Sequence, residues 1–437
     1  MTSRPAILVV ELQVPGDKSV AHRLLILASL ADGDSNLAGV PESLDVRRTL
    51  ACLQALGARI EDRGGGHVSV RGPTEWRTPS RPLDCGNSGT TARLLIGLLA
   101  GLGVGAELRG DLSLSDRPMD RVVYPLQAMG ARITYVGHAD RFPIQVEERA
   151  SGELRTLRYR PRVSSAQVRA ALLLAALTSR TDLEILDRLR PRDHTERMLR
   201  AMGAPVQTEV LEEGERVSFR GSRWSGALQP LDVTVPGDLS SAAFLIVSAL
   251  LSDRPLKILD VGLNPTRAGF LEVLSGMGAS IAHETRIVFA GEPVGSLLVK
   301  PGRLSPFDIG AEIIPRLVDE VPALVALASR VDGLSVVRGA AELRVKESDR
   351  ISLMVSNLQA LGVACEEIDD GLRVRGSAGP LIGTVRTSGD HRIAMAFGAL
   401  GCAPGCDILV DDSECVDVSF PGFWRALDDV TRREASP

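Results

Sequence analysis

The sequence has few aromatic residues, no surplus of positive charge and no long apolar run. Aromatic residues make up 3% of the 437 residues, and the formal net charge is −5 at pH 7. Nucleic-acid-binding proteins usually carry a basic surplus and stack bases on aromatic rings, so this composition argues against that class. No apolar run approaches the roughly 18 residues of a membrane span, and the run at 6–10 is too short for the core of a signal peptide. We therefore expect a cytoplasmic protein that contacts neither nucleic acid nor membrane.

The cysteines and the first glycine-containing turn lack the spacing of familiar sites. The two closest of the six cysteines, Cys402 and Cys406, have no second Cys or His pair at zinc-like spacing nearby. We expect six free thiols and neither a metal nor an organic cofactor. The turn at 15–19 is similar to a nucleotide-binding P-loop, but that template requires glycine where the chain has Leu12 and Asp17. A P-loop is therefore excluded.

One sequence motif recurs along the whole chain. The pattern L-x-x-[LM]-G occurs five times at intervals of 73, 73, 75 and 84 residues, and one sixth of the chain is about 73 residues. Each copy predicts the end of a helix, a glycine after its C-terminus and then an alternating strand. The glycines are Gly57, Gly130, Gly203, Gly278 and Gly362. A degraded sixth copy is expected at 423–430.

A second pattern places a short polar turn before an apolar helix six times. The tetrapeptide Val-Pro-Gly-Asp occurs at 14–17 and again at 235–238, which is close to three periods later. Four of the turns are separated by 69, 77 and 75 residues and align at Ser19, Ser88, Ser165 and Ser240. The two patterns agree on the period. We therefore expect six α/β units grouped as two halves of three.

Charged residues accompany several of these turns. A helix N-terminus favours an anion because its backbone N–H groups are free and the helix dipole is positive there. Capping and solvated charges would explain each segment taken alone, but not why cations recur beside the turns. The segment 342–351 is rich in charge, the segment 114–121 places Arg117 and Arg121 in one proline-bounded loop, and Asp319 begins a helix. The cations beside the turns are Lys18, Arg23, Arg93 and Arg392. Lysine and arginine side chains in this setting bind phosphates or carboxylates.

Nine segments, in order along nearly the whole chain, resemble the motifs of the 5-enolpyruvylshikimate-3-phosphate synthases, also called 3-phosphoshikimate 1-carboxyvinyltransferases. They are PGDKSVAHR, GNSGTTARLL, DRPMDR, SSAQVRAALLLA, RPRDHTERML, VPGDLSSAAF, NPTRAGF, ELRVKESDR and DHRIAMAF. One such motif would be weak, but nine in register are specific. The resemblance implies an α/β fold of two similar inside-out domains, each with three repeated βαβαββ-like units of about 73 residues.

The resemblance also places the domain boundaries. The first domain is expected at 16–235, and the second at 1–15 together with 236–437. The hinge crossovers would then lie near Pro15 and Pro236, so the two Val-Pro-Gly-Asp segments mark equivalent places in the two halves. The family resemblance implies a monomer whose domains close over the substrates.

The implied reaction transfers the enolpyruvyl group of phosphoenolpyruvate to the 5-hydroxyl of shikimate 3-phosphate. Its products are 5-enolpyruvylshikimate 3-phosphate and phosphate, in the shikimate pathway to chorismate and the aromatic amino acids. Both substrates are polyanions, which accounts for Arg and Lys in the loops of an acidic protein. By resemblance, Asp319 is the base for the 5-hydroxyl and Glu347 relays a proton to the methylene carbon. Lys18 is the third catalytic candidate, and the division of roles among the three stays open.

The binding residues follow from the same motifs. Those for shikimate 3-phosphate are Lys18, Ser19, Arg23, Ser164, Ser165, Gln167, Arg192, Asp319 and Lys346. Those for phosphoenolpyruvate are Lys18, Gly89, Arg117, Gln167, Arg350 and Arg392. Family members with Ala at the position of Gly89 resist glyphosate, so Gly89 predicts an enzyme that glyphosate inhibits. Some members carry Lys where this chain has Val418, so one phosphoenolpyruvate contact is absent or supplied elsewhere.

Two alternatives stay open. The UDP-N-acetylglucosamine enolpyruvyl transferases share the fold and the donor, but they place a reactive Cys in the loop that corresponds to 111–120, which has none. A non-catalytic repeat protein that binds polyanions or RNA would use the same charges as phosphate contacts. The scarcity of aromatic residues and the acidic net charge argue against the second alternative.

Overall fold

The computed structural model describes residues 9–149 and 154–432, which form two compact units. One unit, called the N-terminal unit below, contains Gly16–Val235 and Val288–Glu292. The other, the C-terminal unit, contains Met1–Pro15, Pro236–Ile287 and Pro293–Pro437. Residues 1–8 and 433–437, which the sequence assigns to the second domain, and 150–153, assigned to the first, lie outside the described residues.

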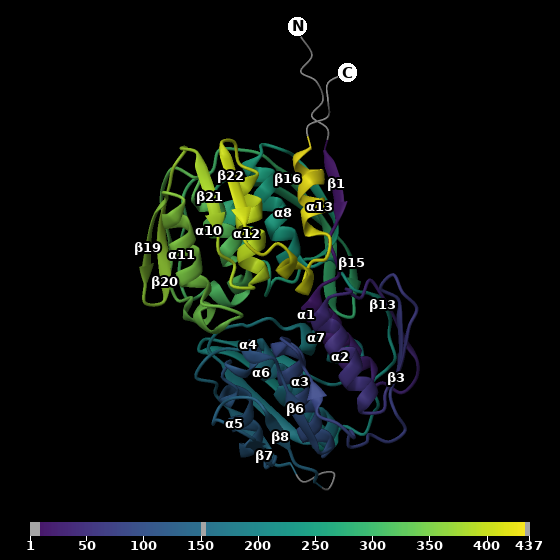
Figure 1. Ribbon diagram of the computed structural model, residues 1–437. Coiled ribbons are helices and arrows are strands. Elements are labelled where there is room, and N and C mark those ends of the chain that lie inside the picture. Colours follow the sequence, from purple (N-terminus) through teal and green to yellow (C-terminus); the bar gives the residue numbers. More distant parts are fainter. Residues whose placement is uncertain (1–8, 150–153, 433–437) are drawn as a thin grey trace. The chain divides into compact units, whose positions relative to one another are not determined.

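The N-terminal unit, coloured from purple to teal in Figure 1, contains three four-stranded sheets with the same strand order. In each sheet the first two strands are parallel, and the other two join them antiparallel. The sheets are β13 (Asp232–Thr234), β2 (Ser35–Ala38), β4 (Val68–Arg71), β3 (Arg59–Asp62); β5 (Leu83–Asp84), β6 (Ala106–Arg109), β8 (Ile144–Val146), β7 (Ile133–Tyr135); and β9 (Leu157–Tyr159), β10 (Asp182–Asp187), β12 (Gly214–Arg220), β11 (Gln207–Leu211). The predicted βαβαββ unit therefore occurs three times here.

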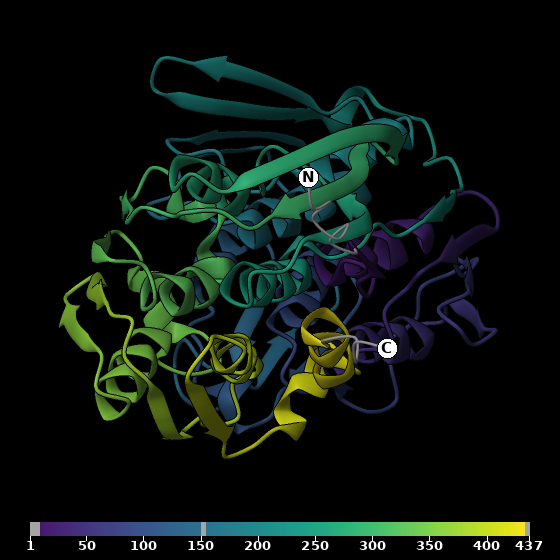
Figure 2. The same cartoon turned by 90° about the horizontal axis from the view of Figure 1, so that it is seen from above.

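The C-terminal unit repeats this order twice and ends with a shortened copy. Its sheets are β1 (Val10–Gln13), β14 (Leu256–Gly262), β16 (Glu292–Lys300), β15 (Ser280–Phe289); β17 (Asp308–Ile309), β18 (Gly333–Val337), β20 (Gly371–Gly376), β19 (Ala364–Ile368); and β21 (Leu381–Val385), β22 (Cys406–Val410). After β22, the described chain continues into α13 (Phe423–Thr431) and adds no hairpin. Both elements are yellow in Figure 2. The degraded sixth copy of the repeat is thus a helix without its strands.

Strands β1 and β13 each pair with a strand that is more than 190 residues away in the sequence. Strand β1 runs parallel to β14, and β13 runs parallel to β2. β1 and β13 are each followed by the tetrapeptide Val-Pro-Gly-Asp. The helix that comes next is the first helix of one half of the repeat pattern. Asp17 and Asp238 cap these two helices by accepting from the backbone N–H of Val20 at 3.0 Å and of Ser240 at 2.8 Å. The serines aligned from sequence, Ser19 and Ser240, therefore lie inside the first helical turn and do not cap it.

Three helices in each unit are almost entirely buried, and others lie on the outside. The buried helices are α1 (Lys18–Ala28), α3 (Gly89–Leu102), α6 (Ala166–Ser179), α8 (Leu239–Leu251), α10 (Val321–Ala328) and α12 (His391–Gly401). The outer ones are α2 (Leu44–Ala55), α5 (Asp120–Ala128), α7 (His194–Ala201), α9 (Gly269–Gly276), α11 (Arg350–Ala360) and α13, with the short α4 (Leu112–Ser115) in a loop. Helices inside and sheets outside are the predicted inside-out arrangement.

Small residues allow the buried helices to approach closely. Gly97 of α3 lies against Ala171 of α6, where an added Cβ would collide with the alanine backbone. Gly101 lies against Ala175 one turn later, and a Cβ there would meet the carbonyl oxygen at 2.6 Å. Glycine at these two positions therefore permits the close packing of α3 against α6. Among the described residues, no helix has the length and apolar character needed to cross a membrane.

Candidate active site

The first two turns of α1 hold two cations of the N-terminal unit. The Nζ atom of Lys18 lies 2.7 Å from Oδ2 of Asp45, at the start of α2. Arg23, one turn further, is buried; its Nε donates to Oγ1 of Thr195 at 2.8 Å, and its guanidinium also donates to the backbone oxygen of Ser19 at 2.8 Å. Burial lowers the pKa of Arg23 to about 10, and nearby carboxylates oppose this shift. Arg23 therefore stays charged near neutral pH and has a fixed orientation.

The first turn of α3 brings together three of the residues predicted to bind phosphoenolpyruvate, which are Gly89, Arg117 and Gln167. Arg93 donates to the side-chain oxygen of Gln167 at 3.0 Å and to the backbone oxygen of Gly89 at 3.4 Å. Arg117 donates to the side-chain oxygen of Asn87. A Cβ added to Gly89 would lie 2.7 Å from one terminal nitrogen of Arg93 and 3.3 Å from that of Arg117. The two guanidinium groups thus leave space for a hydrogen atom at residue 89, but not for a methyl group.

The start of α6 supplies the third group of the N-terminal unit. Ser165 caps the helix by accepting from the backbone N–H of Val168 at 3.4 Å, and Ser164 donates to a carboxylate oxygen of Asp187. Arg192 lies in the loop before α7, and its charge is among the causes that lower the pKa of Arg23. The predicted residues for shikimate 3-phosphate in this unit therefore come from the N-terminal turns of α1 and α6 and from the loop before α7.

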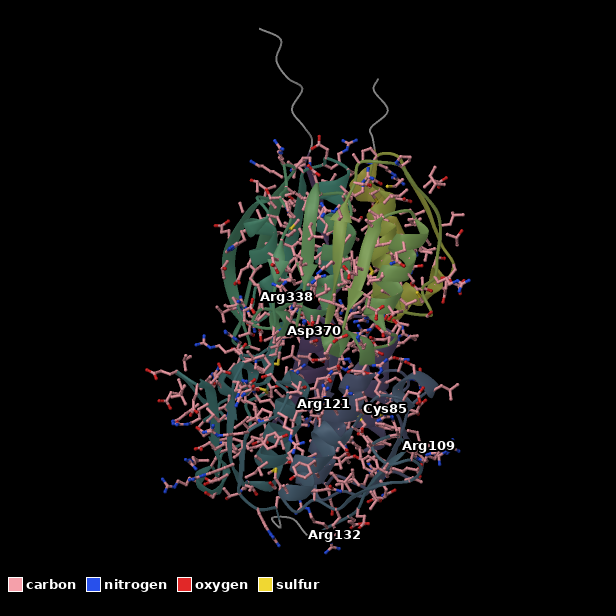
Figure 3. The ribbon with its side chains drawn as sticks, turned by 90° about the vertical axis from the view of Figure 1, so that its left-hand side faces the viewer. Cys85, Arg109, Arg121, Arg132, Arg338 and Asp370 are labelled. Carbon is pink, nitrogen blue, oxygen red and sulfur yellow. The ribbon has the colours of Figure 1, made fainter. Side chains whose placement is uncertain are left out.

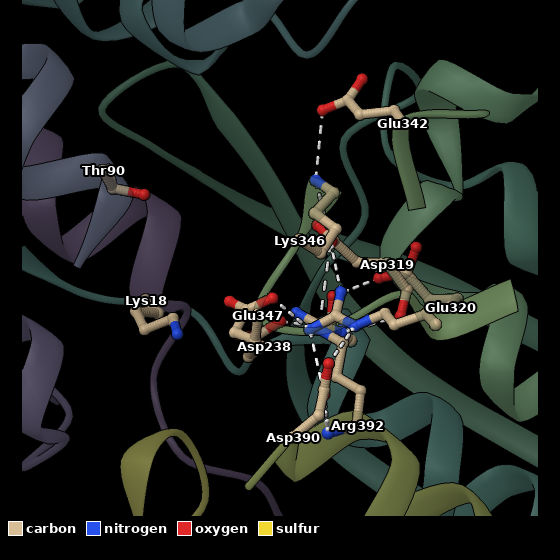
Figure 4. Close-up of polar contacts among 12 residues, drawn as sticks. Lys18, Thr90, Asp238, Asp319, Glu320, Glu342, Lys346, Glu347, Asp390 and Arg392 are labelled. Carbon is tan, nitrogen blue, oxygen red and sulfur yellow. Dashed lines mark hydrogen bonds and ion pairs between the residues drawn. The ribbon is translucent and has the colours of Figure 1, made fainter. Parts of the chain in front are cut away.

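In the C-terminal unit, three cations surround Asp319 (Figure 4). Its Oδ1 lies 3.6 Å from a terminal nitrogen of Arg350, 3.7 Å from Nζ of Lys346 and 3.9 Å from Nε of Arg392. Arg392 also donates to the backbone oxygen of Asp319 at 2.9 Å. Asp319 sits in a short 3₁₀ turn before α10. The residues predicted from three distant segments of the chain therefore lie together.

Arg350 connects this cluster to two further carboxylates. Its Nε donates to Asp390 at 2.8 Å, and a terminal nitrogen donates to Glu347 at 2.5 Å. Burial acts to lower the pKa of Arg350, but the charges of Asp390 and Glu347 outweigh it and raise that pKa above its usual value. Arg350 is therefore a permanent cation, and Glu347 is held beside it.

One expectation about the loop 114–121 is wrong. Arg121, labelled in Figure 3, lies in the first turn of α5, whereas Arg117 lies in the loop before it. The reason is local: Asp120 provides an acidic residue in the first turn and the following apolar residues are buried, so the helix begins one residue before Arg121. The two arginines do not share one loop.

Sequence reasoning missed the partners that orient the predicted cations. Asp45, Thr195 and Asp390 were not singled out, although each accepts from a predicted binding residue. The sequence explains the omission for Asp390, because an Asp before a helix is also an ordinary cap, and Asp390 does accept from the backbone N–H of Arg392 at 2.9 Å. Of the six histidines, His67, His138 and His283 are exposed, and His22, His194 and His391 are buried.

The family model of EPSP synthase (3-phosphoshikimate 1-carboxyvinyltransferase) matches residues 3–427 of the chain. The chain belongs to this family. The 3-phosphoshikimate 1-carboxyvinyltransferase of Salinibacter ruber is 44% identical to it over 426 residues, which cover 96% of each chain. That of Thermus thermophilus is 45% identical over 420 residues, which cover 95% of each chain.

Solved structures show the same fold. The EPSP synthase of Acinetobacter baumannii has a TM-score of 0.83 and 35% identity, with 97% of this chain and 96% of that chain covered. The enolpyruvyl transferase NikO of Streptomyces tendae has a TM-score of 0.73 at 19% identity, covering 98% of this chain and 95% of that one, and so supports the fold alone. The predicted family and the two-domain inside-out α/β fold are confirmed.

No metal centre is suggested by the residues that the structure describes. Within 9–149 and 154–432, no three His, Cys, Asp or Glu side chains come together as ligands for a metal ion. All six cysteines are free thiols, and three of them, Cys52, Cys85 and Cys415, are buried.

Proposed function

We propose that the chain transfers the enolpyruvyl group of phosphoenolpyruvate to the 5-hydroxyl of shikimate 3-phosphate, releasing phosphate. The observation that carries the proposal is the group of Asp319 and Glu347 around Arg350, in a member of the EPSP synthase family. Two carboxylates beside permanent cations provide a base and an acid for proton transfer. The same cations provide charges for anionic substrates.

Shikimate 3-phosphate is assigned to the turns of α1 and α6. Ser19, Ser165 and Gln167 offer hydroxyl and amide groups at or near helix N-termini, where a phosphate is favoured. Arg23 and Arg192 supply positive charge, and the fixed orientation of Arg23 reduces the entropy cost of binding. The set assigned to this substrate also includes Lys18, Ser164, Asp319 and Lys346.

Phosphoenolpyruvate is assigned to the arginines of both units. Arg117 and Gln167 belong to the group around Arg93 and Gly89, and Arg350 and Arg392 belong to the group around Asp319. Arg is suited to phosphate and carboxylate because its planar group can donate two parallel hydrogen bonds. Lys18 is assigned to both substrates. The Lys that some family members carry near the C-terminus is replaced by Val418, so these residues make up the cationic set without it.

The chemistry is an addition followed by an elimination. Asp319 takes the proton of the 5-hydroxyl while the hydroxyl oxygen bonds to the central carbon of phosphoenolpyruvate. At the same time, Glu347 gives a proton to the methylene carbon. This carbon then returns a proton to Glu347, and the bond between the central carbon and the phosphate oxygen breaks. Phosphate leaves and the enol ether remains. Lys18 is the third group in this proposal, as a cation near the departing phosphate.

The proposal includes a cytoplasmic, monomeric enzyme that needs no cofactor and that glyphosate inhibits. The residue that bears on inhibition is Gly89, since a methyl group there would meet Arg93 and Arg117. The reaction consists of proton transfers, the formation of one C–O bond and the cleavage of another with release of phosphate, and the side chains named above provide the acid, the base and the cations.

Phosphate release from phosphoenolpyruvate tests the proposal. We expect release with shikimate 3-phosphate as acceptor and none with UDP-N-acetylglucosamine. Release with the nucleotide sugar alone would assign the chain to the other acceptor. No release with either acceptor, from folded protein, would favour a non-catalytic protein that binds polyanions.

A further inference from the structure

A buried ionic cluster lies beneath the start of α6, outside the residues assigned to the reaction. Arg169, on the second turn of α6, is 2% exposed. One terminal nitrogen donates to Glu215 at 2.6 Å and to Glu196 at 3.0 Å, and the other lies 3.5 Å from Oδ2 of Asp187. We call these four residues the Arg169 cluster. It joins α6, α7, β10 and β12 around one cation.

Two carboxylates of the cluster lie on neighbouring strands of one sheet. Asp187 and Glu215 are directly opposite in the antiparallel pair β10 and β12. Like charges in such a pair repel each other, and the guanidinium of Arg169 is bonded to both. Arg169 therefore fixes the position of Asp187, which is 1% exposed and has no freedom to turn toward solvent.

Asp187 uses its two oxygens for two different purposes. Oδ2 faces Arg169, whereas Oδ1 accepts from the hydroxyl of Ser164 and, at 3.4 Å, from the backbone N–H of Leu189. Ser164 directly precedes Ser165, the cap of α6. The chain of contacts thus runs from a buried cation to the turn assigned to shikimate 3-phosphate.

We propose that Asp187, held by Arg169, is a positioning residue for shikimate 3-phosphate, because it fixes the turn at Ser164 and Ser165. This inference rests on the proposed function of that turn. Asp187 does not touch the substrate. It acts by keeping Ser164 in one orientation, so that the hydroxyl groups and the free N–H groups of the turn are arranged before the phosphate binds.

The cluster offers a matched control for Asp187. Glu215 also bonds to Arg169, lies opposite Asp187 and is buried, but no hydrogen bond connects it to Ser164 among those that the structure describes. Burial raises the pKa of Glu215, and the charge of Arg169 only partly opposes this. Glu215→Gln keeps the size of the side chain and an acceptor oxygen for Arg169. Asp187→Asn differs, because its NH₂ group would face either Arg169 or the backbone N–H of Leu189, and each of these can only donate.

The experiment measures the dissociation constant of shikimate 3-phosphate by titration calorimetry on the full chain. We expect Asp187→Asn to raise it about tenfold, the equivalent of one lost hydrogen bond, and Glu215→Gln to change it less than about twofold. In kinetics, Asp187→Asn should raise the KM for shikimate 3-phosphate and leave kcat and the KM for phosphoenolpyruvate nearly unchanged. Melting temperatures of the two variants should be similar, so that stability does not explain the difference.

A double-mutant cycle separates positioning from general disruption. In a Ser164→Ala background, Asp187→Asn should cause no further loss of affinity. Equal losses of affinity for Asp187→Asn and Glu215→Gln would overturn the inference. Additive losses of affinity when Asp187→Asn is combined with Ser164→Ala would also overturn it. If Asp187→Asn does not fold, Asp187→Glu tests the same prediction. Glutamate keeps the negative charge but moves the acceptor oxygen away from the hydroxyl of Ser164. A wild-type protein that neither binds shikimate 3-phosphate nor releases phosphate would instead refute the proposed function.

Discussion

The guanidinium of Arg350 and the carboxylate of Asp390 form a buried pair, with Nε 2.8 Å from Oδ2. The two side chains are 1% and 0% exposed. Arg350 is the first residue of α11, and Asp390 caps α12, so the pair joins two helix starts. Because Asp390 neutralises part of its charge, Arg350 can remain buried and still contact Glu347 and Asp319.

Removing one partner of this pair should be costly. We expect Asp390→Asn to lower the free energy of unfolding by about 3 to 5 kcal/mol, because it leaves a buried cation without its main partner. Urea denaturation measures this. The matched control is Asp308→Asn, since Asp308 pairs with Arg338 at 2.5 Å on the surface (Figure 3) and should contribute less than about 1 kcal/mol. Equal effects of the two substitutions would contradict the assigned role of the buried pair.

The two proposed catalytic carboxylates should affect turnover more than binding. Asp319→Asn and Glu347→Gln each remove a proton acceptor, and we expect kcat to fall by about 10²- to 10⁴-fold. Calorimetry should still detect shikimate 3-phosphate binding to both variants. Glu272→Gln is the control, because Glu272 also contacts an arginine, Arg316, but lies on the surface. Loss of binding with unchanged kcat in saturating substrate would assign these residues to binding alone.

Gly89→Ala tests the space beside the two guanidinium groups. The added methyl group would meet the ends of Arg93 and Arg117, which are flexible, so the variant should fold. We expect a several-fold higher KM for phosphoenolpyruvate and a larger rise in the glyphosate concentration needed for half-inhibition. Gly276→Ala, at a helix position with open space around it, should change neither. Unchanged inhibition of Gly89→Ala would show that the inhibitor does not use this space.

His22 should make stability depend on pH in the acid range. Burial first, and then the charges of Lys18 and Arg23, lower its pKa well below the usual 6.5. As pH falls below 6.5, the unfolded chain binds a proton that the folded chain does not, so stability decreases, by at most about 1.4 kcal/mol per pH unit. Its Nδ1 lies 2.7 Å from Oγ1 of Thr49, a contact that Gln can replace.

Unfolding measured from pH 7.5 to 5 checks this. His22→Gln should have a weaker dependence on pH than the wild type, and His67→Gln, at an exposed position, should match the wild type. A dependence that is identical in all three proteins would show that His22 has the same pKa in the folded and the unfolded chain.

The repeat pattern predicted most of the fold. The five glycines of the L-x-x-[LM]-G motif all have positive φ, from 84° at Gly362 to 108° at Gly57, and a strand follows each one. The signal is strong because the left-handed conformation after a helix strongly favours glycine. Pairing was harder to predict. That β1 joins β14 and β13 joins β2 depends on contacts across more than 190 residues, which local patterns do not encode.

The family motifs predicted the cations and carboxylates of the site. They did not predict the residues that orient those side chains. Lys346, Glu347 and Arg350 lie in one dense segment, and the structure joins them to Asp319. Arg169 looked like part of an apolar helix, because its three carboxylates come from separate strands and a helix. Its role depends on three-dimensional proximity, which no spacing in the sequence reveals.

The most direct test of the proposed reaction is the product formed in D₂O from phosphoenolpyruvate and shikimate 3-phosphate, analysed by mass spectrometry. If Glu347 protonates the methylene carbon before elimination, the transient methyl group contains solvent hydrogen, and one of its three hydrogens is then lost. We expect an enolpyruvyl adduct of shikimate 3-phosphate with deuterium in its methylene group. An adduct formed without any deuterium would contradict addition followed by elimination, and the absence of any adduct would contradict the enolpyruvyl transfer itself.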